Sequence, residues 1–332
     1  MIGSTIIASA PTRLDFGGGW TDVPPYPAER GGFVCNLAIE RRATVTLTIP
    51  PTIAPAGSSC SEPCPEPHPE PYLEPLPAAA LRRAGITHAQ VAIHSDFPIG
   101  AGLGGSSSVG VALAAAIARL QGTSADPAVL AEQSRRVEAE DLGVAGGFQD
   151  HYAAAFGGAL GLTFAAENHA EPLPLTDRCV DDLEHCLTVV YTGESRISGE
   201  TITAVLDAYR DRVPRVVAAL DRMATLARGM RDALAGGDLP TLAALIDEHW
   251  QHQRSLHPRI TTDRIDALEV RVRDAGATGF KALGASGGGS VLVCSSAEHA
   301  PRVQAAAATL GTVLSWRVAR DGVRVEAPSP RL

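Results

Sequence analysis

The pattern of apolar and polar residues predicts three β-strands in the first hundred residues. Residues 6–13 and 34–50 have the pattern of strands, and the stretch 44–49 is rich in β-branched side chains. Residues 91–95 alternate between apolar and polar positions. The apolar segment 109–120 predicts a helix, so the chain begins with a mixture of strands and helices.

The rest of the chain predicts further helices separated by strands. One helix has clear ends, because Asp126 can cap it, Pro127 suits the first helical position and Gly143 can terminate it. The other predicted helices cover residues 78–84, 149–156, 201–235, 239–256 and 265–275. The other predicted strands cover residues 160–164, 187–192, 291–294 and 313–318, and loops are expected at 50–77, 163–174 and 328–332. A boundary near residue 165 would give two domains, 1–165 and 166–332.

Composition argues against several classes of protein. The 332 residues carry a formal net charge of −9, which argues against a nucleic-acid partner. No apolar run reaches the ~20 residues of a membrane span, and the N-terminus lacks the pattern of a secretory signal. Six scattered cysteines suit a reducing compartment, so we expect a cytoplasmic protein. Cys60, Cys64 and His68 have metal-ligand spacing, but their Pro/Glu/Ser-rich surroundings favour a solvated loop over a zinc site.

A segment rich in glycine and serine, residues 98–108, connects the predicted strand 91–95 to the helix 109–120. Glycines let the backbone approach a ligand, and the helix N-terminus adds partial positive charge, so the segment predicts a phosphate-binding loop. It has neither the Gly-Lys-Ser/Thr of a Walker A loop nor the third glycine of a dinucleotide-binding fingerprint. A flexible linker is the alternative, which the flanking strand and helix disfavour. The residues expected to bind phosphates are Gly100, Ala101, Gly102, Leu103, Gly104, Gly105, Ser106 and Ser107.

Two more glycine-dense segments, 10–22 and 281–290, suggest backbone packed closely around ligands. Together with 98–107, which is similar to the motif Pro-x-x-x-Gly-Leu-Gly-Ser-Ser, they make the chain resemble the GHMP small-molecule kinases. Gly105 departs from the motif, because most members have a serine there. The resemblance implies an α+β fold of two domains, the first like domain 2 of ribosomal protein S5 and the second ferredoxin-like. It also implies ATP and Mg²⁺ as cofactors.

Two branches of this family are similar to different parts of the chain. Residues 138–143 and 146–158 resemble the D-glycero-D-manno-heptose 7-phosphate kinases, whereas residues 18–26 resemble the L-fucokinases. Both branches phosphorylate the anomeric hydroxyl of a sugar, so the resemblance implies a sugar or sugar phosphate as the small-molecule substrate. The heptose phosphate is the first candidate, because this chain is far shorter than the multidomain fucokinases, and L-fucose is the second. A homodimer is a candidate assembly.

The resemblance also implies a metal site. Ser106 would bind Mg²⁺ together with a carboxylate. Helical spacing puts Glu138 and Asp141 on the inward face of their helix and Glu140 on the outward face. The family's glutamate precedes a glycine by five residues, as Glu138 precedes Gly143. We therefore expect Glu138 to be the second metal ligand, against the alternative of an exposed helical charge.

The expected catalytic residues are Asp150 and Arg13. Asp150 lies between a glycine turn and small residues, where a carboxylate can orient or deprotonate an attacking hydroxyl; its alternative role is helix capping. Arg13 matches the family's cation near the catalytic aspartate. Asp22 is expected to bind sugar hydroxyls, while Arg196 and Lys281 would bind a substrate phosphate. The full set expected at the substrate is Gly18, Gly19, Trp20, Thr21, Asp22, Gly147, Arg196 and Lys281.

The remaining histidines and glycines are given supporting roles. His151 is expected to support the pocket without binding metal. His249, His252 and His257 lie on or near one predicted helix and are expected at the surface. The glycines of 284–289 are expected to pack against the site.

Two functions other than a sugar kinase remain open on the sequence alone. A ligand sensor could retain the kinase fold without catalysis, but the presence of Ser106, Glu138 and Asp150 disfavours it. A decarboxylase of the same family would also use ATP, but the motifs around Trp20 and Gln149 disfavour it.

Overall fold

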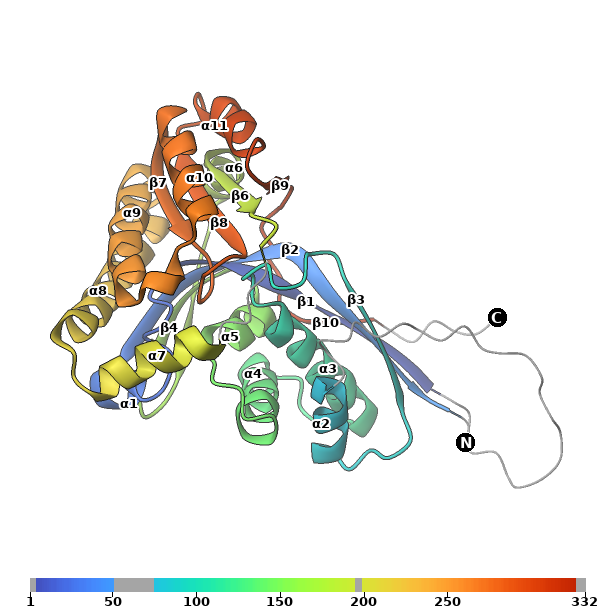
Figure 1. Ribbon diagram of the computed structural model, residues 1–332. Coiled ribbons are helices and arrows are strands. Elements are labelled where there is room, and N and C mark those ends of the chain that lie inside the picture. Colours follow the sequence, from blue (N-terminus) through green and yellow to red (C-terminus); the bar gives the residue numbers. More distant parts are fainter. Residues whose placement is uncertain (1–3, 51–74, 195–198, 327–332) are drawn as a thin grey trace, which may run out of the picture.

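The computed structural model describes residues 4–50, 75–194 and 199–326, which form two antiparallel sheets with helices packed on them (Figure 1). In the larger sheet the strand order is β10-β1-β2-β4-β5. Strand β4 pairs with residues 32–37 of β2, and β3 pairs with residues 43–48 of the same strand. The strands are β1 (Ser4–Gly17), β2 (Gly32–Ile49), β3 (Gln90–Ser95), β4 (Ala159–Phe164), β5 (His169–Leu173) and β10 (Arg324–Val325). The long β1 and β2 extend the strands predicted at 6–13 and 34–50.

A layer of helices covers one face of the larger sheet (Figure 1). Every residue from Ser107 to Ala118 is buried, because the small side chains of α3 pack against the sheet on one side and other helices on the other. The helix predicted to end at Gly143 stops earlier and continues as a π-helical turn. The helices are α2 (Pro75–Arg83), α3 (Gly105–Gln121), α4 (Pro127–Arg136), the π-turn η1 (Val137–Asp141) and α5 (Gln149–Phe156). The short helix α1 (Tyr26–Arg30) lies between β1 and β2 in the sequence.

The smaller sheet has the strand order β7-β8-β6-β9, which is the ferredoxin-like order expected for the second domain. Its strands are β6 (Leu187–Tyr191), β7 (Ala277–Ala282), β8 (Ser290–Ser295) and β9 (Thr312–Leu314). Its helices are α6 (Asp177–Cys186), α7 (Gly199–Arg210), α8 (Pro214–Gly236), α9 (Leu239–Leu256), the short η2 (Pro258–Ile260), α10 (Asp263–Asp274) and α11 (Ala300–Ala307). The helix predicted at 201–235 is therefore two helices, because Pro214 begins a new one.

The two halves of the chain do not separate at residue 165. β5 and β10 both lie beyond that point, yet both belong to the larger sheet. The prediction of a loop at 163–174 is wrong, because β5 pairs with β4 there. The sequence shows little apolar alternation at β5, since it is an edge strand with mostly exposed residues. The strand predicted at 313–318 is limited to β9.

Helix α8 joins the two halves by packing on the second face of the larger sheet. Met230 of α8 shares a core with Leu14 and Phe16 of β1. The contact is close, since a Cβ on Gly17 would lie 2.7 Å from the Met230 methyl group. The end of β1 is thus fixed between the two halves of the molecule. Over the described ranges, no helix combines the length and apolar character needed to cross a bilayer.

Candidate active site

The loop between β3 and α3 depends on glycine for its path. Gly102 and Gly104 have φ angles of 72° and 78°, in the left-handed region that favours glycine. A Cβ on Gly104 would also lie 3.0 Å from the carboxyl carbon of Asp150. Gly105, which departs from the family motif, leaves room for the Phe97 ring, which a side chain at 105 would overlap. The loop backbone therefore lies directly against the candidate catalytic residue.

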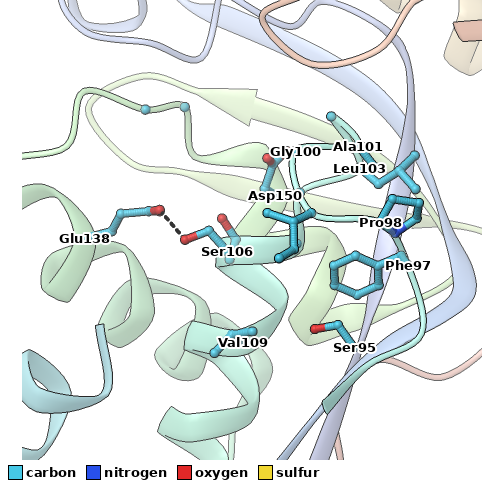
Figure 2. Close-up of a pocket in the computed structure, with 17 residues that line it drawn as sticks. Ser95, Phe97, Pro98, Gly100, Ala101, Leu103, Ser106, Val109, Glu138 and Asp150 are labelled. Carbon is cyan, nitrogen blue, oxygen red and sulfur yellow. Dashed lines mark hydrogen bonds between the residues drawn. The ribbon is translucent and has the colours of Figure 1, made fainter. Parts of the chain in front are cut away.

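This loop and the first turn of α3 line a cavity of about 270 Å³, the loop cavity (Figure 2). All eight residues expected to bind phosphates line it, and Glu138 and Asp150 line it as well. Helix α3 has 17 residues and no acidic residue in its first turn. Its N-terminal N–H groups and partial positive charge are therefore available to an anion in the loop cavity.

The two side chains expected to bind metal meet at the edge of the loop cavity. Ser106 Oγ donates a hydrogen bond to Glu138 Oε1 over 2.8 Å (Figure 2). Glu140 and Asp141 turn away and pair with Arg83, so Glu138 alone of the three acidic candidates lines the cavity. In the described ranges, no group of three or more His, Cys, Asp or Glu residues could hold a metal. A hydroxyl and one carboxylate nevertheless fit Mg²⁺, which takes few protein oxygens when phosphates and water complete its shell.

His151 supports Glu138 from the side away from the cavity. Its Nε2 lies 3.0 Å from Glu138 Oε2, and its Nδ1 lies 3.0 Å from Ser134 Oγ. Burial would raise the pKa of Glu138, but the hydrogen bond and charge of His151 and the hydrogen bonds of Ser106 and Ser107 outweigh burial and lower it. Glu138 is therefore ionised at neutral pH, which is the state that a metal ligand requires.

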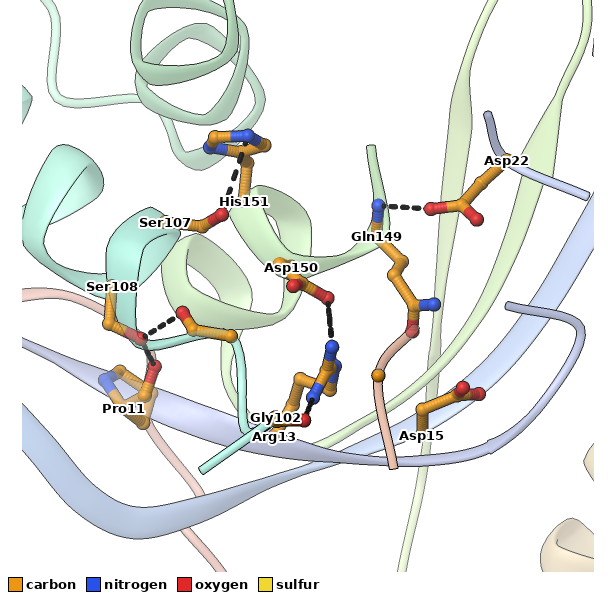
Figure 3. A network of polar contacts seen from close by, with 12 residues as sticks. Pro11, Arg13, Asp15, Asp22, Gly102, Ser107, Ser108, Gln149, Asp150 and His151 are labelled. Carbon is orange, nitrogen blue, oxygen red and sulfur yellow. Dashed lines mark hydrogen bonds and ion pairs between the residues drawn. The ribbon is translucent and has the colours of Figure 1, made fainter. Parts of the chain in front are cut away.

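A second cavity of about 210 Å³, the aspartate cavity, adjoins the loop cavity. Asp150, in the first turn of α5, accepts a hydrogen bond at Oδ1 from Arg13 Nε over 2.8 Å and forms an ion pair with Arg13 Nη2 over 2.7 Å (Figure 3). Arg13 also donates to the carbonyl oxygen of Gly102 over 2.6 Å, so it connects the aspartate to the phosphate-binding loop. The residues that line both cavities are Gly102, Gly104, Gly146, Gly147 and Asp150.

Asp22 forms another acidic part of the aspartate cavity. Its Oδ2 accepts the backbone N–H of Gln149 over 3.0 Å (Figure 3). Burial and the nearby charges of Asp150 and Asp15 together raise the pKa of Asp22 to about 7, against the lowering effect of the Gln149 hydrogen bond. Gly147 is required beside it, because a Cβ there would overlap the Asp22 carboxylate.

The turn after β1 contributes Gly19, Trp20, Asp22 and Val23 to the aspartate cavity. Trp20 has a φ of 78°, which is rare for a bulky residue. Gly18 and Thr21 do not line it. Thr21 Oγ1 donates to the Gly18 carbonyl oxygen over 2.6 Å, and its side chain is fully buried. Gly18 and Thr21 therefore shape the turn, and the expectation that they contact substrate is not supported by their positions.

Lys281 is not placed to bind a substrate phosphate. It is fully buried, and its Nζ donates to both the carbonyl oxygen and Oδ2 of Asp15 over 2.8 Å. The ammonium group therefore holds Asp15 at the end of β1. The other expected phosphate ligand, Arg196, lies outside the described residues, as do Cys60, Cys64 and His68.

His249 is buried, which contradicts its expected place at the surface. Its Nε2 accepts the backbone N–H of Gly18 over 2.8 Å, and burial lowers its pKa to about 3, so it is neutral. Helical spacing could have found it, because it follows Leu242 and Ile246 by seven and three residues on the buried face of α9.

The third glycine segment packs against the loop between β3 and α3, as expected. A Cβ on Gly284 would lie 3.2 Å from Gly102, and the backbone N–H of Ser290 donates to the Ala101 carbonyl oxygen over 2.8 Å. From the other side, the N–H of Arg13 donates to the Leu103 carbonyl oxygen over 3.0 Å. The loop is therefore held between β1 and the second domain.

Comparison with known proteins identifies the family. The profile of the GHMP kinase N-terminal domain matches residues 76–158, and that of the GHMP kinase C-terminal domain matches residues 230–312. The chain belongs to the GHMP kinases. A crystal structure of a D-glycero-D-manno-heptose 1-phosphate kinase from Bacteroides thetaiotaomicron covers 98% of this chain and 100% of that one, with a TM-score of 0.76 at 23% identity. The two-domain α+β fold expected from the sequence is confirmed.

Relatives of known activity come from both branches that the sequence resembles. The bifunctional fucokinase/GDP-fucose pyrophosphorylase of Arabidopsis thaliana is 26% identical over 89% of this chain and 30% of its own length. The D-glycero-alpha-D-manno-heptose 7-phosphate kinase of Campylobacter jejuni is 28% identical over 59% of this chain and 58% of its own length. The chain thus spans less than two thirds of the length of either relative.

Proposed function

We propose that this GHMP kinase transfers the terminal phosphoryl group of ATP to the anomeric (C1) hydroxyl of a sugar. The observation that carries the proposal is that the loop cavity and the aspartate cavity meet at Asp150. One cavity presents a helix N-terminus to an anion, and the other presents carboxylates to hydroxyl groups. Phosphoryl transfer depends mainly on positioning and charge stabilisation, which such an arrangement provides.

The loop cavity would hold the nucleotide. Backbone N–H groups of residues 100–107 would bind its phosphates, and Ser106 and Glu138 would hold Mg²⁺ through their side-chain oxygens. When bound, Mg²⁺ neutralises charge on the phosphates. In the protein alone, Ser106 donates a hydrogen bond to Glu138, and His151 orients the Glu138 carboxylate.

Asp150 would position the acceptor hydroxyl and receive its proton. Nε and Nη2 of Arg13 both contact Oδ1, and within the described residues Oδ2 makes no hydrogen bond. Oδ2 is therefore the oxygen that can accept a hydrogen bond from the sugar. The Arg13 guanidinium beside it would stabilise negative charge on the transferred group.

The first candidate acceptor is D-glycero-D-manno-heptose 7-phosphate, supported by the Campylobacter jejuni relative and by the segment 138–158. L-fucose is the second candidate, because the fucokinase-containing relative aligns with 89% of this chain and residues 18–26 resemble the L-fucokinases. A non-catalytic sensor is disfavoured, since Ser106, Glu138 and Asp150 all line the loop cavity.

The proposal is tested by measuring ATP consumption with each of these two sugars and with neither. The position of the new phosphate is then assigned by ³¹P NMR. A sugar-dependent release of ADP with a product phosphorylated at C1 supports the proposal. Phosphorylation at another carbon contradicts the assigned position, and the absence of transfer to both sugars contradicts the proposed substrates.

A further inference from the structure

One wall of the aspartate cavity has buried polar atoms that the protein does not satisfy. Asp15 Oδ1, Gln149 Oε1 and Trp20 Nε1 are buried and have no hydrogen-bond partner within residues 4–50, 75–194 and 199–326. All three residues line the aspartate cavity. Buried polar groups are nearly always hydrogen-bonded, because leaving one unpaired destabilises the fold. Of the eleven buried side-chain atoms without a partner in the described residues, three belong to residues that line this one cavity, and this grouping points to a ligand that supplies the missing partners.

These three residues form one wall, although they come from different elements. Asp15 is near the end of β1, Trp20 follows in the turn, and Gln149 begins α5. Gly19 lies between them: a Cβ there would be 2.5 Å from Asp15 Oδ2 and 3.0 Å from Gln149 Nε2. In Figure 3, Asp15, Gln149 and Asp22 lie on one side of the Asp150–Arg13 pair, and Ser107 and His151 lie on the other. The wall therefore faces the acceptor and not the nucleotide.

The charges around this wall select against an anion. Lys281 is committed to Asp15 Oδ2, and Arg13 is committed to Asp150 and the Gly102 carbonyl oxygen. Among the described residues that line the aspartate cavity, Arg13 is the only lysine or arginine. A phosphate at this wall would meet the carboxylates of Asp15 and Asp22 without a free cation.

The chemistry of the free atoms matches hydroxyl groups. A carboxylate oxygen and an amide oxygen accept hydrogen bonds, and an indole N–H donates one. Lys281 keeps Asp15 in its acceptor form: burial would raise the pKa of Asp15, but the charges of Lys281 and Arg13 and the hydrogen bond from Lys281 lower it. The positive φ of Trp20 is the kind of backbone strain that persists at functional sites.

We propose that Asp15 and Gln149 determine which sugar the kinase accepts, by taking hydrogen bonds from two hydroxyl groups on an unphosphorylated part of the sugar. Trp20 Nε1 donates to a hydroxyl oxygen on the same part. A phosphate already present on the substrate must then lie elsewhere. This inference rests on the proposed function, because it treats the aspartate cavity as the acceptor site.

The Gln149→Met variant separates a binding role from a structural one. Methionine has a similar size, and the contact with Asp22 is kept because the backbone makes it. Binding of L-fucose and of D-glycero-D-manno-heptose 7-phosphate is measured by titration calorimetry without nucleotide, and turnover is measured separately. For each sugar that binds, we expect Kd and KM to rise about 10- to 100-fold with a much smaller change in kcat. The melting temperature should stay the same or rise, because a buried unpaired amide is removed.

Thr188→Val is the matched control. Thr188 is also buried with an unpartnered Oγ1 in the described chain, but it lies in β6 and lines neither the loop cavity nor the aspartate cavity. Its removal should leave the melting temperature the same or higher and leave sugar binding unchanged. The double variant Asp15→Leu/Lys281→Met removes the Asp15 acceptor without leaving a buried ammonium unpaired. If Asp15 binds a hydroxyl, this variant folds and has a KM above that of the wild type; a wild-type KM would assign Asp15 a structural role only.

The outcomes distinguish this inference from the proposed function. If the sugars bind tightly but are not phosphorylated, the proposed function is wrong, while the proposed role of Asp15 and Gln149 in sugar binding still stands. If the sugars are phosphorylated with an unchanged KM in Gln149→Met, the proposed role of Gln149 is wrong, while the proposed kinase function still stands. A lower melting temperature in Gln149→Met with unchanged binding shows a structural role, and failure of both sugars to bind the wild-type protein also overturns the inference.

Discussion

Replacement of Lys281 by methionine is expected to destabilise the protein and not merely to weaken phosphate binding. Lys281 is fully buried with its Nζ 2.8 Å from Asp15 Oδ2, and the Asp15 side chain is only 3% exposed. Its loss leaves a buried carboxylate without its direct counter-charge. Breaking a buried ion pair in this way costs about 3–5 kcal/mol, whereas an exposed pair contributes about 0–1 kcal/mol. The melting temperature should fall by roughly 5–15 °C.

Thermal unfolding followed by circular dichroism measures this loss, with Arg210→Met as the control. Arg210 pairs with Asp207 over 2.8 Å, but both side chains are more than half exposed, so this variant should melt within ~2 °C of the wild type. The double variant Asp15→Asn/Lys281→Met should melt above the single Lys281→Met variant, because it removes both charges.

The reasoning is refuted if Lys281→Met melts like the wild type and loses affinity only for phosphorylated sugars. That result would show that the ammonium group leaves Asp15 and binds substrate, as the sequence alone suggested.

Three further variants test the proposed metal ligand Glu138, the ionisation of Asp22 and the close contact of Gly147 with Asp22. Glu138→Gln should raise the Mg²⁺ concentration needed for half-maximal activity, while Glu140→Gln, whose side chain faces Arg83, should not; equal titrations would remove Glu138 from the metal site. Since the pKa of Asp22 is about 7, kcat/KM for the sugar should rise through that pH as the carboxylate ionises, and Asp22→Asn should abolish the rise. The raised pKa means that the folded protein binds the Asp22 proton more tightly than the unfolded chain, where the pKa has its ordinary value of 3.8. The free energy of unfolding of the wild type, relative to that of Asp22→Asn, should therefore fall as the pH rises from about 4 to about 7. A difference in unfolding free energy that does not change with pH would contradict the raised pKa. Gly147→Ala should sharply weaken sugar binding by displacing Asp22, while Gly236→Ala, at the open end of α8, should be neutral in a binding titration.

The sequence was most informative where local geometry decides the outcome. The strand, glycine loop and helix around residues 91–120 follow from alternation, glycine content and apolar content within one short segment. Helical phase separated Glu138 from Glu140, but its placement of Asp141 on the inward face is wrong, because the π-helical turn directs Asp141 to Arg83. These features need no knowledge of distant contacts, so they could be predicted.

The features that could not be predicted depend on contacts between distant segments. Lys281 and Asp15 are 266 positions apart, and only the packing of the second domain on β1 reveals that they pair. Position 105 is a glycine where the motif has a serine, and the Phe97 ring fills the space that a serine side chain would need. β5 was missed because its partner strand, and not its own pattern, makes it a strand.

The proposed reaction depends on Asp150 to direct the acceptor hydroxyl at the junction of the two cavities. Its test is the turnover number and nucleotide affinity of Asp150→Asn, measured with the sugar that the wild-type enzyme phosphorylates. We expect kcat to fall about 10²- to 10⁴-fold with nearly unchanged nucleotide affinity. Turnover like that of the wild type would show that Asp150 does not have this role.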